Sequence, residues 1–305
     1  MGRVKALAVV ASRVRFEEKQ IFAALERRRI PYVHIDARRF SAELPTATEP
    51  ALPAGDRRKG EPRAERDRPY AAALNREISQ SRGYYASLLL EAQGVPAVNR
   101  AEVIATCGDK LRTSLELTRA GLPIPRTAVA LTRKSAAEVM DKLGFPVVVK
   151  PLTGSWGRLA AVLRDHETAE AVLEHRAALP SPQQHVVYLQ ELIDKPGRDI
   201  RVIVVGDDVV AATYRSADGW RTNVARGGRS WPCPLSDELT RLALAAARAV
   251  GGGVLGVDLV ENRDGRLHVL EVNHTVEFKG VQTAHGDTVD VADAIVGQAL
   301  AEATE

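Results

Sequence analysis

Residues 256–273 run Gly256-Val-Asp-Leu-Val260, then Glu261-Asn-Arg-Asp-Gly265, then Arg266-Leu-His-Val-Leu-Glu-Val-Asn273. Two apolar runs flank an Asp-Gly pair, which is typical of a two-residue turn between antiparallel strands. With Asp264 and Gly265 as the turn, we expect Asp258 directly opposite Glu271. Asn273 shares their face of the sheet, because side chains alternate along a strand.

Two carboxylates directly opposite each other repel, and the sequence offers no obvious basic partner on the neighbouring faces. A divalent cation would turn this repulsion into ligation. Asp258, Glu271 and Asn273 supply hard oxygen donors, which suit Mg²⁺ held jointly with phosphates, with Mn²⁺ as an alternative. The competing interpretation is a longer loop with a slipped register, in which the acids point to water. Under the metal hypothesis, D258K abolishes Mg²⁺-dependent activity and leaves the fold intact.

The rest of the chain alternates expected strands and helices, which is typical of an α/β fold. It opens with a strand, a helix and a second strand at 4–11, 16–29 and 31–36. Apolar side chains at helical spacing in 236–250 predict an amphipathic helix with Ser236 as its N-cap. Further helices are expected at 84–93, 109–120 and 136–143, and further strands at 127–131, 146–152, 186–193, 200–205 and 209–214.

Residues 41–69 interrupt this alternation. The segment contains five prolines, and its six basic side chains are balanced by six acidic ones. Such a segment cannot bury enough apolar surface to become ordered. The sequence therefore predicts a mobile loop of zero net charge.

The composition is that of an ordinary globular chain, with 305 residues, 45% hydrophobic and 27% charged. This length corresponds to two or three domains. No apolar run reaches the ~18–20 residues that cross a bilayer, and the N-terminus lacks the long apolar region of a signal peptide. Cys107 and Cys233 are the only cysteines, which excludes a disulfide framework. We therefore expect a cytoplasmic protein that does not bind membranes.

The charge is unevenly distributed along the chain. Residues 1–100 carry 19 Lys and Arg against 12 Asp and Glu, a net charge of +7, whereas the remainder has a net charge of −4. A basic front half suits an acidic macromolecular partner, and a solvated charged surface is the alternative. Nucleic acid is disfavoured as that partner, because no known nucleic-acid module is recognisable and aromatic residues are only 5% of the chain.

Two lysines and a glycine loop are candidates for phosphate binding. Lys150 ends the apolar run Phe145-Pro-Val-Val-Val-Lys150, where a charge needs an anionic partner. The loop Gly154-Ser-Trp-Gly-Arg158 follows, and glycines let backbone N–H groups approach phosphate oxygens closely. This loop is neither a Walker A motif nor GxGxxG, and taken alone it also fits a plain turn.

The order of these motifs resembles the ATP-grasp superfamily, in particular the RimK-type carboxylate–amine ligases. The series comprises Asp109-Lys110, Val149-Lys150-Pro151, Gly154–Gly157, Gln190-Glu-Leu-Ile193, Asp199-Ile-Arg201 and the hairpin. Within that group, two segments look closest to the LysX and ArgX ligases, which join an amino acid to the carrier protein LysW. These segments are Asn75-Arg-Glu-Ile-Ser79 and Asn273-His-Thr-Val-Glu-Phe-Lys279.

The resemblance covers about residues 75–305 and implies an ATP-grasp fold with three domains. An N-terminal α/β domain at 1–98 carries the loop 41–69, for which the resemblance offers no counterpart. A central ATP-binding domain with the phosphate lid is expected at 99–189. A C-terminal ATP-binding domain with the metal site is expected at 190–305.

The resemblance also implies roles for single residues. ATP would be bound by Lys110, Lys150, Gly154, Ser155, Trp156, Gly157, Gln190, Glu191, Leu192, Ile193 and Asp199. Within this set, Ser155 to Gly157 would form the flexible phosphate lid, and Glu191 and Ile193 would contact adenine. Arg201 and Arg226 would be catalytic and stabilise the transferred phosphoryl group. Mg²⁺ would be bound by Asp258, Glu271 and Asn273. The carboxylic and amino acid substrates would be bound by Arg215, Asn223, Asn273, Thr275, Glu277 and Phe278.

The reaction implied by the resemblance is an ATP-dependent ligation through an acyl phosphate. The acceptor would be the C-terminal glutamate of a small acidic carrier protein similar to LysW. The donor of the amino group would be α-aminoadipate or glutamate, which differ by one methylene, worth ~1 kcal/mol of preference. The alternatives are a RimK-like glutamate ligase acting on a ribosomal protein or small peptide, and a non-catalytic ATP-binding regulatory protein. A homodimer or homotetramer is expected from the family.

Overall fold

The structure is a computed structural model that describes residues 5–43, 68–154, 157–217, 219–220 and 228–304. Most of the loop predicted at 41–69 lies outside the described residues. The chain forms two compact units, one of residues 1–101 with 296–305 and the other of residues 102–295. Among the described residues, no helix combines the length and the apolar character needed to span a bilayer.

The first unit contains a parallel four-stranded sheet in the order β2-β1-β3-β4. The strand-helix-strand opening predicted from the sequence is confirmed, because β1 and β2 run parallel and α1 joins them. Ala86 and Leu90 of α3 pack against Ala8 and Val10 of β1. The elements are β1 (Leu7–Val10), α1 (Phe16–Arg27), β2 (Tyr32–Ile35), β3 (Ala73–Asn75), α3 (Gln80–Ala92), β4 (Ala97–Val98) and α10 (Val291–Thr304), whose first residues belong to the second unit.

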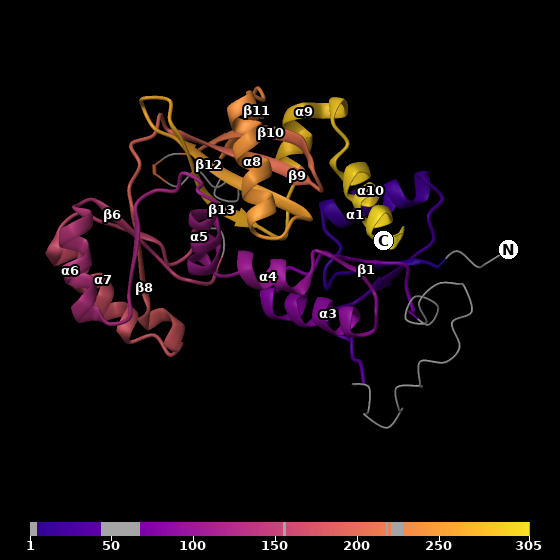
Figure 1. Ribbon diagram of the computed structural model, residues 1–305, viewed down its shortest axis with the longest axis horizontal. Coiled ribbons are helices and arrows are strands. Elements are labelled where there is room, and N and C mark those ends of the chain that lie inside the picture. The colour runs from indigo at the N-terminus through magenta and orange to yellow at the C-terminus, as the bar shows by residue number, and fades with distance from the viewer. Residues whose placement is uncertain (1–4, 44–67, 155–156, 218, 221–227, 305) are drawn as a thin grey trace. The chain divides into compact units, whose positions relative to one another are not determined.

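The second unit contains two antiparallel sheets, and the first has the strand order β5-β8-β6-β7. Helices α6 and α7 lie side by side against it (Figure 1). Met140 of α6 and Leu173 of α7 pack on Val147, Val149 and Leu189 of the sheet. The elements are β5 (Thr127–Ala130), α6 (Arg133–Leu143), β6 (Val147–Lys150), β7 (Ala161–Leu163), α7 (His166–Ala177), the 3-10 helix η1 (Pro182–His185) and β8 (Val187–Glu191).

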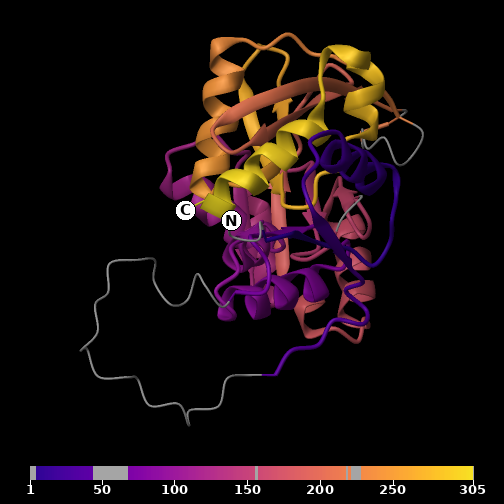
Figure 2. The same ribbon diagram turned by 90° about the vertical axis from the view of Figure 1, so that its right-hand side faces the viewer.

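The second sheet has the order β11-β10-β9-β12-β13. Its apolar face packs on α8, the orange helix beside the strands in Figure 2. Because side chains alternate, Ile200, Val202 and Val204 of β9 enter this core, whereas Arg201 points to the opposite face. The elements are β9 (Arg198–Val205), β10 (Asp208–Ser216), β11 (Arg229–Pro232), α8 (Asp237–Ala249), β12 (Val254–Glu261) and β13 (Leu267–Asn273), with α4 (Ala101–Cys107), α5 (Lys110–Arg119), α9 (Lys279–His285) and η3 (Gly286–Thr288) around them.

The hairpin of β12 and β13 confirms the expected pairing but not the expected turn. Asp258 lies opposite Glu271, as predicted. The two-residue turn was wrong, because Asn262 N donates to Arg266 O at 3.0 Å and three residues form the loop. Gly265 takes φ +82°, which glycine adopts readily. A bulge restores the register, since Leu259 pairs with Val269 and Asp258 with Glu271, leaving Leu270 without a partner.

Candidate active site

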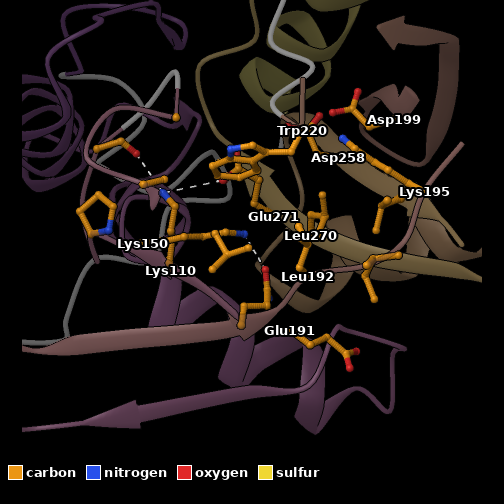
Figure 3. A pocket seen from close by; sticks show the side chains of 18 of the residues that line it. Lys110, Lys150, Glu191, Leu192, Lys195, Asp199, Trp220, Asp258, Leu270 and Glu271 are labelled. Carbon is orange, nitrogen blue, oxygen red and sulfur yellow. Dashed lines mark hydrogen bonds and ion pairs between the residues drawn. The ribbon is translucent and has the colours of Figure 1, made fainter. Parts of the chain in front are cut away.

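A cavity in the second unit is lined by residues of both of its sheets (Figure 3). The cavity contains apolar side chains together with charges of both signs. Its cationic residues are Lys110, Lys150, Arg158, Lys195 and Arg215, and its acidic residues are Glu191, Asp199, Asp258 and Glu271. The remaining lining residues are Val148, Pro151, Gly154, Gly157, Ala160, Gln190, Leu192, Ile193, Trp220, Val260 and Leu270.

Lys110 is the first residue of α5, and the N-cap of this helix fixes its position. The Asp109 side chain is the N-cap and accepts from Leu111 N and Arg112 N. Lys110 Nζ donates to the carbonyl oxygen of Gly154 at 2.9 Å and lies 3.7 Å from Glu271 Oε2. Lys110 therefore connects Gly154 of the glycine loop to Glu271 of β13.

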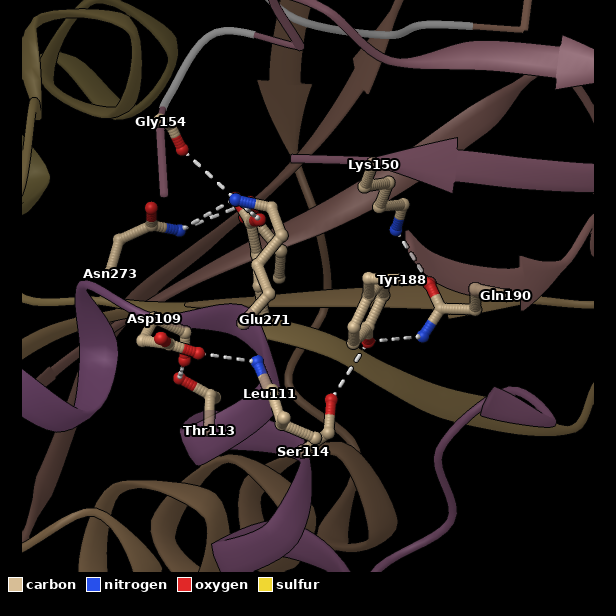
Figure 4. A network of polar contacts seen from close by, with 12 residues as sticks. Asp109, Leu111, Thr113, Ser114, Lys150, Gly154, Tyr188, Gln190, Glu271 and Asn273 are labelled. Atoms are coloured by element: carbon tan, nitrogen blue, oxygen red, sulfur yellow. Dashed lines mark hydrogen bonds and ion pairs between the residues drawn. The ribbon is translucent and has the colours of Figure 1, made fainter. Parts of the chain in front are cut away.

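Lys150 ends β6 and is positioned by a chain of polar side chains. Its Nζ donates to Gln190 Oε1 at 2.5 Å, and Gln190 Nε2 donates to Thr127 Oγ1 and Tyr188 Oη at 3.0 and 3.3 Å. Tyr188 Oη in turn lies 2.8 Å from Ser114 Oγ of α5 (Figure 4). Burial lowers the pKa of Lys150 to about 8, although the charge of Glu271 opposes this effect.

Asp258 has basic partners, which the sequence analysis did not foresee. Arg201 faces it from β9 and forms two hydrogen bonds to its carboxylate at 2.5 and 2.9 Å. Arg215 Nη2 lies 3.0 Å from Asp258 Oδ1, and Arg215 Nε donates to Asp199 Oδ1 at 2.7 Å. The expectation that the neighbouring strands offer no cation was therefore wrong, since strand order, not sequence proximity, decides which side chains meet.

Glu271 and Asn273 complete an oxygen-rich group beside Asp258. Asn273 Nδ2 lies 3.2 Å from Glu271 Oε1 and 3.3 Å from Asp258 Oδ2, so all three side chains share one face as predicted. Burial alone would raise the pKa of Glu271, but the charges of Lys110, Lys150 and Arg201 and the hydrogen bond from Asn273 lower it to about 2. Within the described part of the chain, no cluster of three His, Cys, Asp or Glu could hold a metal ion alone. Two carboxylates and an amide oxygen still fit Mg²⁺ if phosphate oxygens complete its coordination.

The structure brings together only part of the predicted site. Arg201 and Asn273 contact the acids of the cavity without lining it themselves. Glu191 lines it, but its carboxylate points away in Figure 3 and accepts from Arg126 N at 2.8 Å. Outside the cavity lie Thr275, the exposed Glu277 and the fully buried Phe278. Outside the described residues lie Ser155, Trp156, Asn223 and Arg226.

Several cavity residues received no site role in the sequence analysis, among them Val148, Lys195, Trp220 and Leu270. Val148 could have been found, because it stands two positions before Lys150 on the same strand and shares its face. Leu270 could not be found in this way, because simple alternation along β13 places its side chain on the other face of the sheet from Glu271. Only the bulge turns both side chains toward the cavity. Lys195 and Trp220 lie on connecting segments for which the sequence carries no periodic signal.

Comparison with known proteins decides the family. A family model described as the RimK-like ATP-grasp domain matches residues 107–298, and one described as the LysX preATP-grasp domain matches residues 58–106. The chain belongs to the RimK-like ATP-grasp family. The predicted fold is thereby confirmed, and the protein is an ATP-dependent carboxylate–amine ligase.

Two curated relatives and one solved structure show how far the similarity of this ATP-grasp ligase extends. Glutamate–LysW ligase ArgX of Sulfolobus acidocaldarius is 33% identical over 292 residues, 95% of this chain and 96% of that protein. α-Aminoadipate–LysW ligase LysX of Saccharolobus solfataricus is 36% identical over 207 residues, 68% of this chain and 75% of that protein. The crystal structure of a RimK domain ATP-grasp protein from Sphaerobacter thermophilus superposes with a TM-score of 0.73 at 26% identity, covering 97% of this chain and 99% of the other.

Proposed function

We propose that this ligase joins the amino group of glutamate or α-aminoadipate to the C-terminal glutamate carboxylate of a small acidic carrier protein similar to LysW. The proposal places it in amino acid biosynthesis. The proposal of ATP-dependent phosphoryl transfer rests on one observation. Lys110 and Lys150 line the same cavity as Asp258 and Glu271. The choice of carrier and amino acid rests on the names of the relatives, LysX and ArgX.

In the proposed mechanism, the nucleotide lies between the two sheets of the second unit. Lys110 and Lys150 neutralise its phosphates, and Ser155 to Gly157 would form the lid over them, as the resemblance implies. The apolar side chains of Val148, Leu192 and Leu270 provide surfaces for the adenine ring. These residues bind and orient ATP, which phosphoryl transfer requires more than covalent assistance.

The acidic face of β12 and β13 would hold the metal ion. Asp258, Glu271 and Asn273 are the proposed ligands, and a bound Mg²⁺ would neutralise charge on the transferred phosphoryl group. Arg201 and Arg215 lie beside these acids and offer guanidinium groups to the same phosphoryl oxygens. Arg226, named as catalytic by the resemblance, would add to them.

The reaction consists of two transfers. A carboxylate oxygen of the carrier attacks the γ-phosphorus of ATP, the bond to the β-γ bridging oxygen breaks, and an acyl phosphate and ADP form. The uncharged amino group then attacks the acyl carbon, an amide bond forms, and phosphate leaves while the nitrogen loses a proton. The closely spaced arginines in the sequence 215–229 suit the extra carboxylate of either acidic amino acid.

An ADP-release assay tests this proposal. The protein is incubated with MgATP, a LysW-like carrier and either glutamate or α-aminoadipate. We expect ADP release to require both the carrier and one of the two amino acids, and mass spectrometry to show the corresponding adduct on the carrier. ADP release that ignores the carrier would reject the carrier as acceptor, and binding of ATP without turnover would favour a regulatory protein. The homo-oligomeric state and the cytoplasmic location stay predictions.

A further inference from the structure

A second cavity lies in the part of the second unit built on the sheet β5-β8-β6-β7, apart from the residues that line the nucleotide cavity. It is formed where the start of α6, the end of α7, η1 and the start of β8 come together. Its lining residues are Leu131, Thr132, Arg133, Leu173, Arg176, Ala177, Gln184, His185 and Val187. None of these residues takes part in the proposed ligation.

Arg176 is the unusual member of this set, because only 4% of it is exposed. Its Nη2 donates to the carbonyl oxygens of Gln184 and Val186 at 3.1 and 3.4 Å. Its Nε and Nη1 are buried and have no hydrogen-bond partner among the described residues. A buried guanidinium with two unmatched donors is costly unless another group supplies charge and acceptors.

Among the described residues, no acidic side chain lines the cavity around Arg176. The lining includes Arg133 and His185. Burial, with no neighbouring charge to offset it, lowers the pKa of Arg176. The cavity also faces the N-terminal end of α6, an 11-residue helix whose N-cap is Thr132, and a helix N-terminus favours negative charge.

We propose that this cavity binds a small oxyanion, a carboxylate or a phosphate group, with Arg176 as its central ligand. The anion would accept from Nε and Nη1 and would supply the counter-charge that the chain itself does not provide. A water molecule could accept these hydrogen bonds, but it would leave the guanidinium charge uncompensated. Arg133 at the rim, which is also paired with Glu170 at 2.6 Å, would add a second cation.

Occupancy of this site would bear on the glycine loop through η1. Arg176 is bonded to the backbone of Gln184 in η1, and the neighbouring Gln183 accepts from Thr153 Oγ1 at 3.4 Å. Thr153 directly precedes Gly154. A ligand that fixes η1 would therefore also fix the side-chain acceptor of Thr153.

Calorimetric titration of the full-length protein, with the nucleotide cavity filled by ADP and Mg²⁺, tests the proposal. Inorganic phosphate and succinate are titrated separately at constant ionic strength, so that the two sources of an oxyanion are distinguished. We expect saturable binding of at least one of them, with a matching rise in the unfolding temperature. Saturable binding of neither anion would overturn the proposal and would leave water as the occupant.

Two substitutions then locate the binding. R176M keeps the volume of the side chain and should weaken anion binding at least tenfold, while its unfolding temperature without anion should equal or exceed that of the wild type. The matched control is R164M, which makes the same change at an exposed position of the same part of the chain and should leave the affinity within twofold. Binding that persists in R176M would come from another site and would refute the assignment.

A surface substitution covers the case in which R176M does not fold. R133Q changes an exposed side chain at the rim and should weaken anion binding roughly three- to tenfold, because one of two cations is lost. Unchanged affinity in R133Q, together with no folded R176M protein, would count against the site.

Discussion

Asp258 and Glu271 lie directly opposite each other on β12 and β13, yet they form ion pairs with different side chains. Arg201 and Arg215 pair with Asp258 from the same sheet, whereas Glu271 pairs with Lys110, and the charges of Lys150 and Arg201 further favour its ionised form. The repulsion expected between the two acids is thereby relieved without a metal ion. The same four cations surround the place where we propose that the phosphates and Mg²⁺ bind.

The pairing of Asp258 changes the substitution that best tests the metal site. D258K would bury a third positive charge beside Arg201 and Arg215, so the expectation of an intact fold no longer holds. D258N keeps the shape of the side chain. We expect it to lower kcat at least 100-fold and the free energy of unfolding by about 3 kcal/mol, because the buried Arg215 and the partly buried Arg201 lose a carboxylate partner. Steady-state ADP release and urea unfolding measure both effects, and a fully active D258N would remove Asp258 from the mechanism.

The low pKa of Lys150 predicts a pH dependence of ATP binding. Phosphates bind the charged form of Lys150, whose pKa in the ATP-free protein is about 8. The affinity for ATP should therefore be highest well below pH 8. This affinity should fall as the pH rises above 8, because Lys150 of the ATP-free protein is then increasingly uncharged. Titrations between pH 7 and pH 9.5 check this. The matched variant K150R stays charged throughout and should bind ATP with a flat profile, and an equally flat wild-type profile would contradict the assignment.

Gln190 should act as a positioning residue for Lys150. Its Oε1 accepts from Lys150 Nζ, and its Nε2 is held by Thr127 and Tyr188. In Q190L the lysine loses this acceptor, and we expect KM for ATP to rise about tenfold with kcat changed less than threefold. Q190E restores an acceptor and should recover most of the affinity. A variant Q190L with wild-type KM would show that Lys150 is positioned by other groups.

Gly256 leaves room for the guanidinium of Arg201. A Cβ atom at this position would stand 2.8 Å from Arg201 Nη1, which is closer than real contacts allow. Since the end of an arginine side chain can move, G256A should displace Arg201 and lower kcat about tenfold or more, while the unfolding temperature changes little. Gly265 has open space around a Cβ but takes φ +82°, so G265A should show the opposite pattern of lower stability and unchanged kcat.

The first unit contains a buried charge network whose contribution to stability should depend on pH. Glu18, with a side chain 0% exposed, pairs with Arg76 at 3.3 Å and with Arg15 at 3.1 Å. Burial alone would raise the pKa of Glu18, but its hydrogen bonds to Arg15 and the charge of Arg76 lower it. A lowered pKa contributes stability above the pKa of the unfolded state, about 4.3, and this contribution is lost as the pH falls through the folded value.

The variant E18Q isolates this contribution. It should cost about 3 kcal/mol of unfolding free energy at pH 7, because the buried Arg76 loses the charged carboxylate of Glu18. Between pH 5 and pH 3 the wild type should lose more stability than E18Q, so the two curves converge. Parallel curves over this range would show that Glu18 does not contribute to the acid sensitivity.

Local patterns in the sequence were sufficient for much of this architecture. The Asp-Gly pair between apolar runs predicted the hairpin, and alternation placed Asp258, Glu271 and Asn273 on one face. The helical spacing of 236–250 matched α8, whose apolar stripe covers the second sheet. These features were predictable because they depend on residues close together in the chain, where the period of the side chains sets the face they occupy.

Contacts between distant segments needed the tertiary structure. The strand order β10-β9-β12 brings Arg215 and Arg201 to Asp258, and no local sequence pattern predicts these contacts. The bulge at Leu270 compensates for a three-residue turn and turns an apolar side chain toward the cavity, so a correct pairing was predicted from an incorrect turn. Arg176 received no role in the sequence analysis, and only packing shows it to be buried with two unmatched donors. The sequence by itself therefore determined which residue types the site contains, whereas only the tertiary structure decided which charges neutralise each other, because pairing and burial are properties of the packed chain.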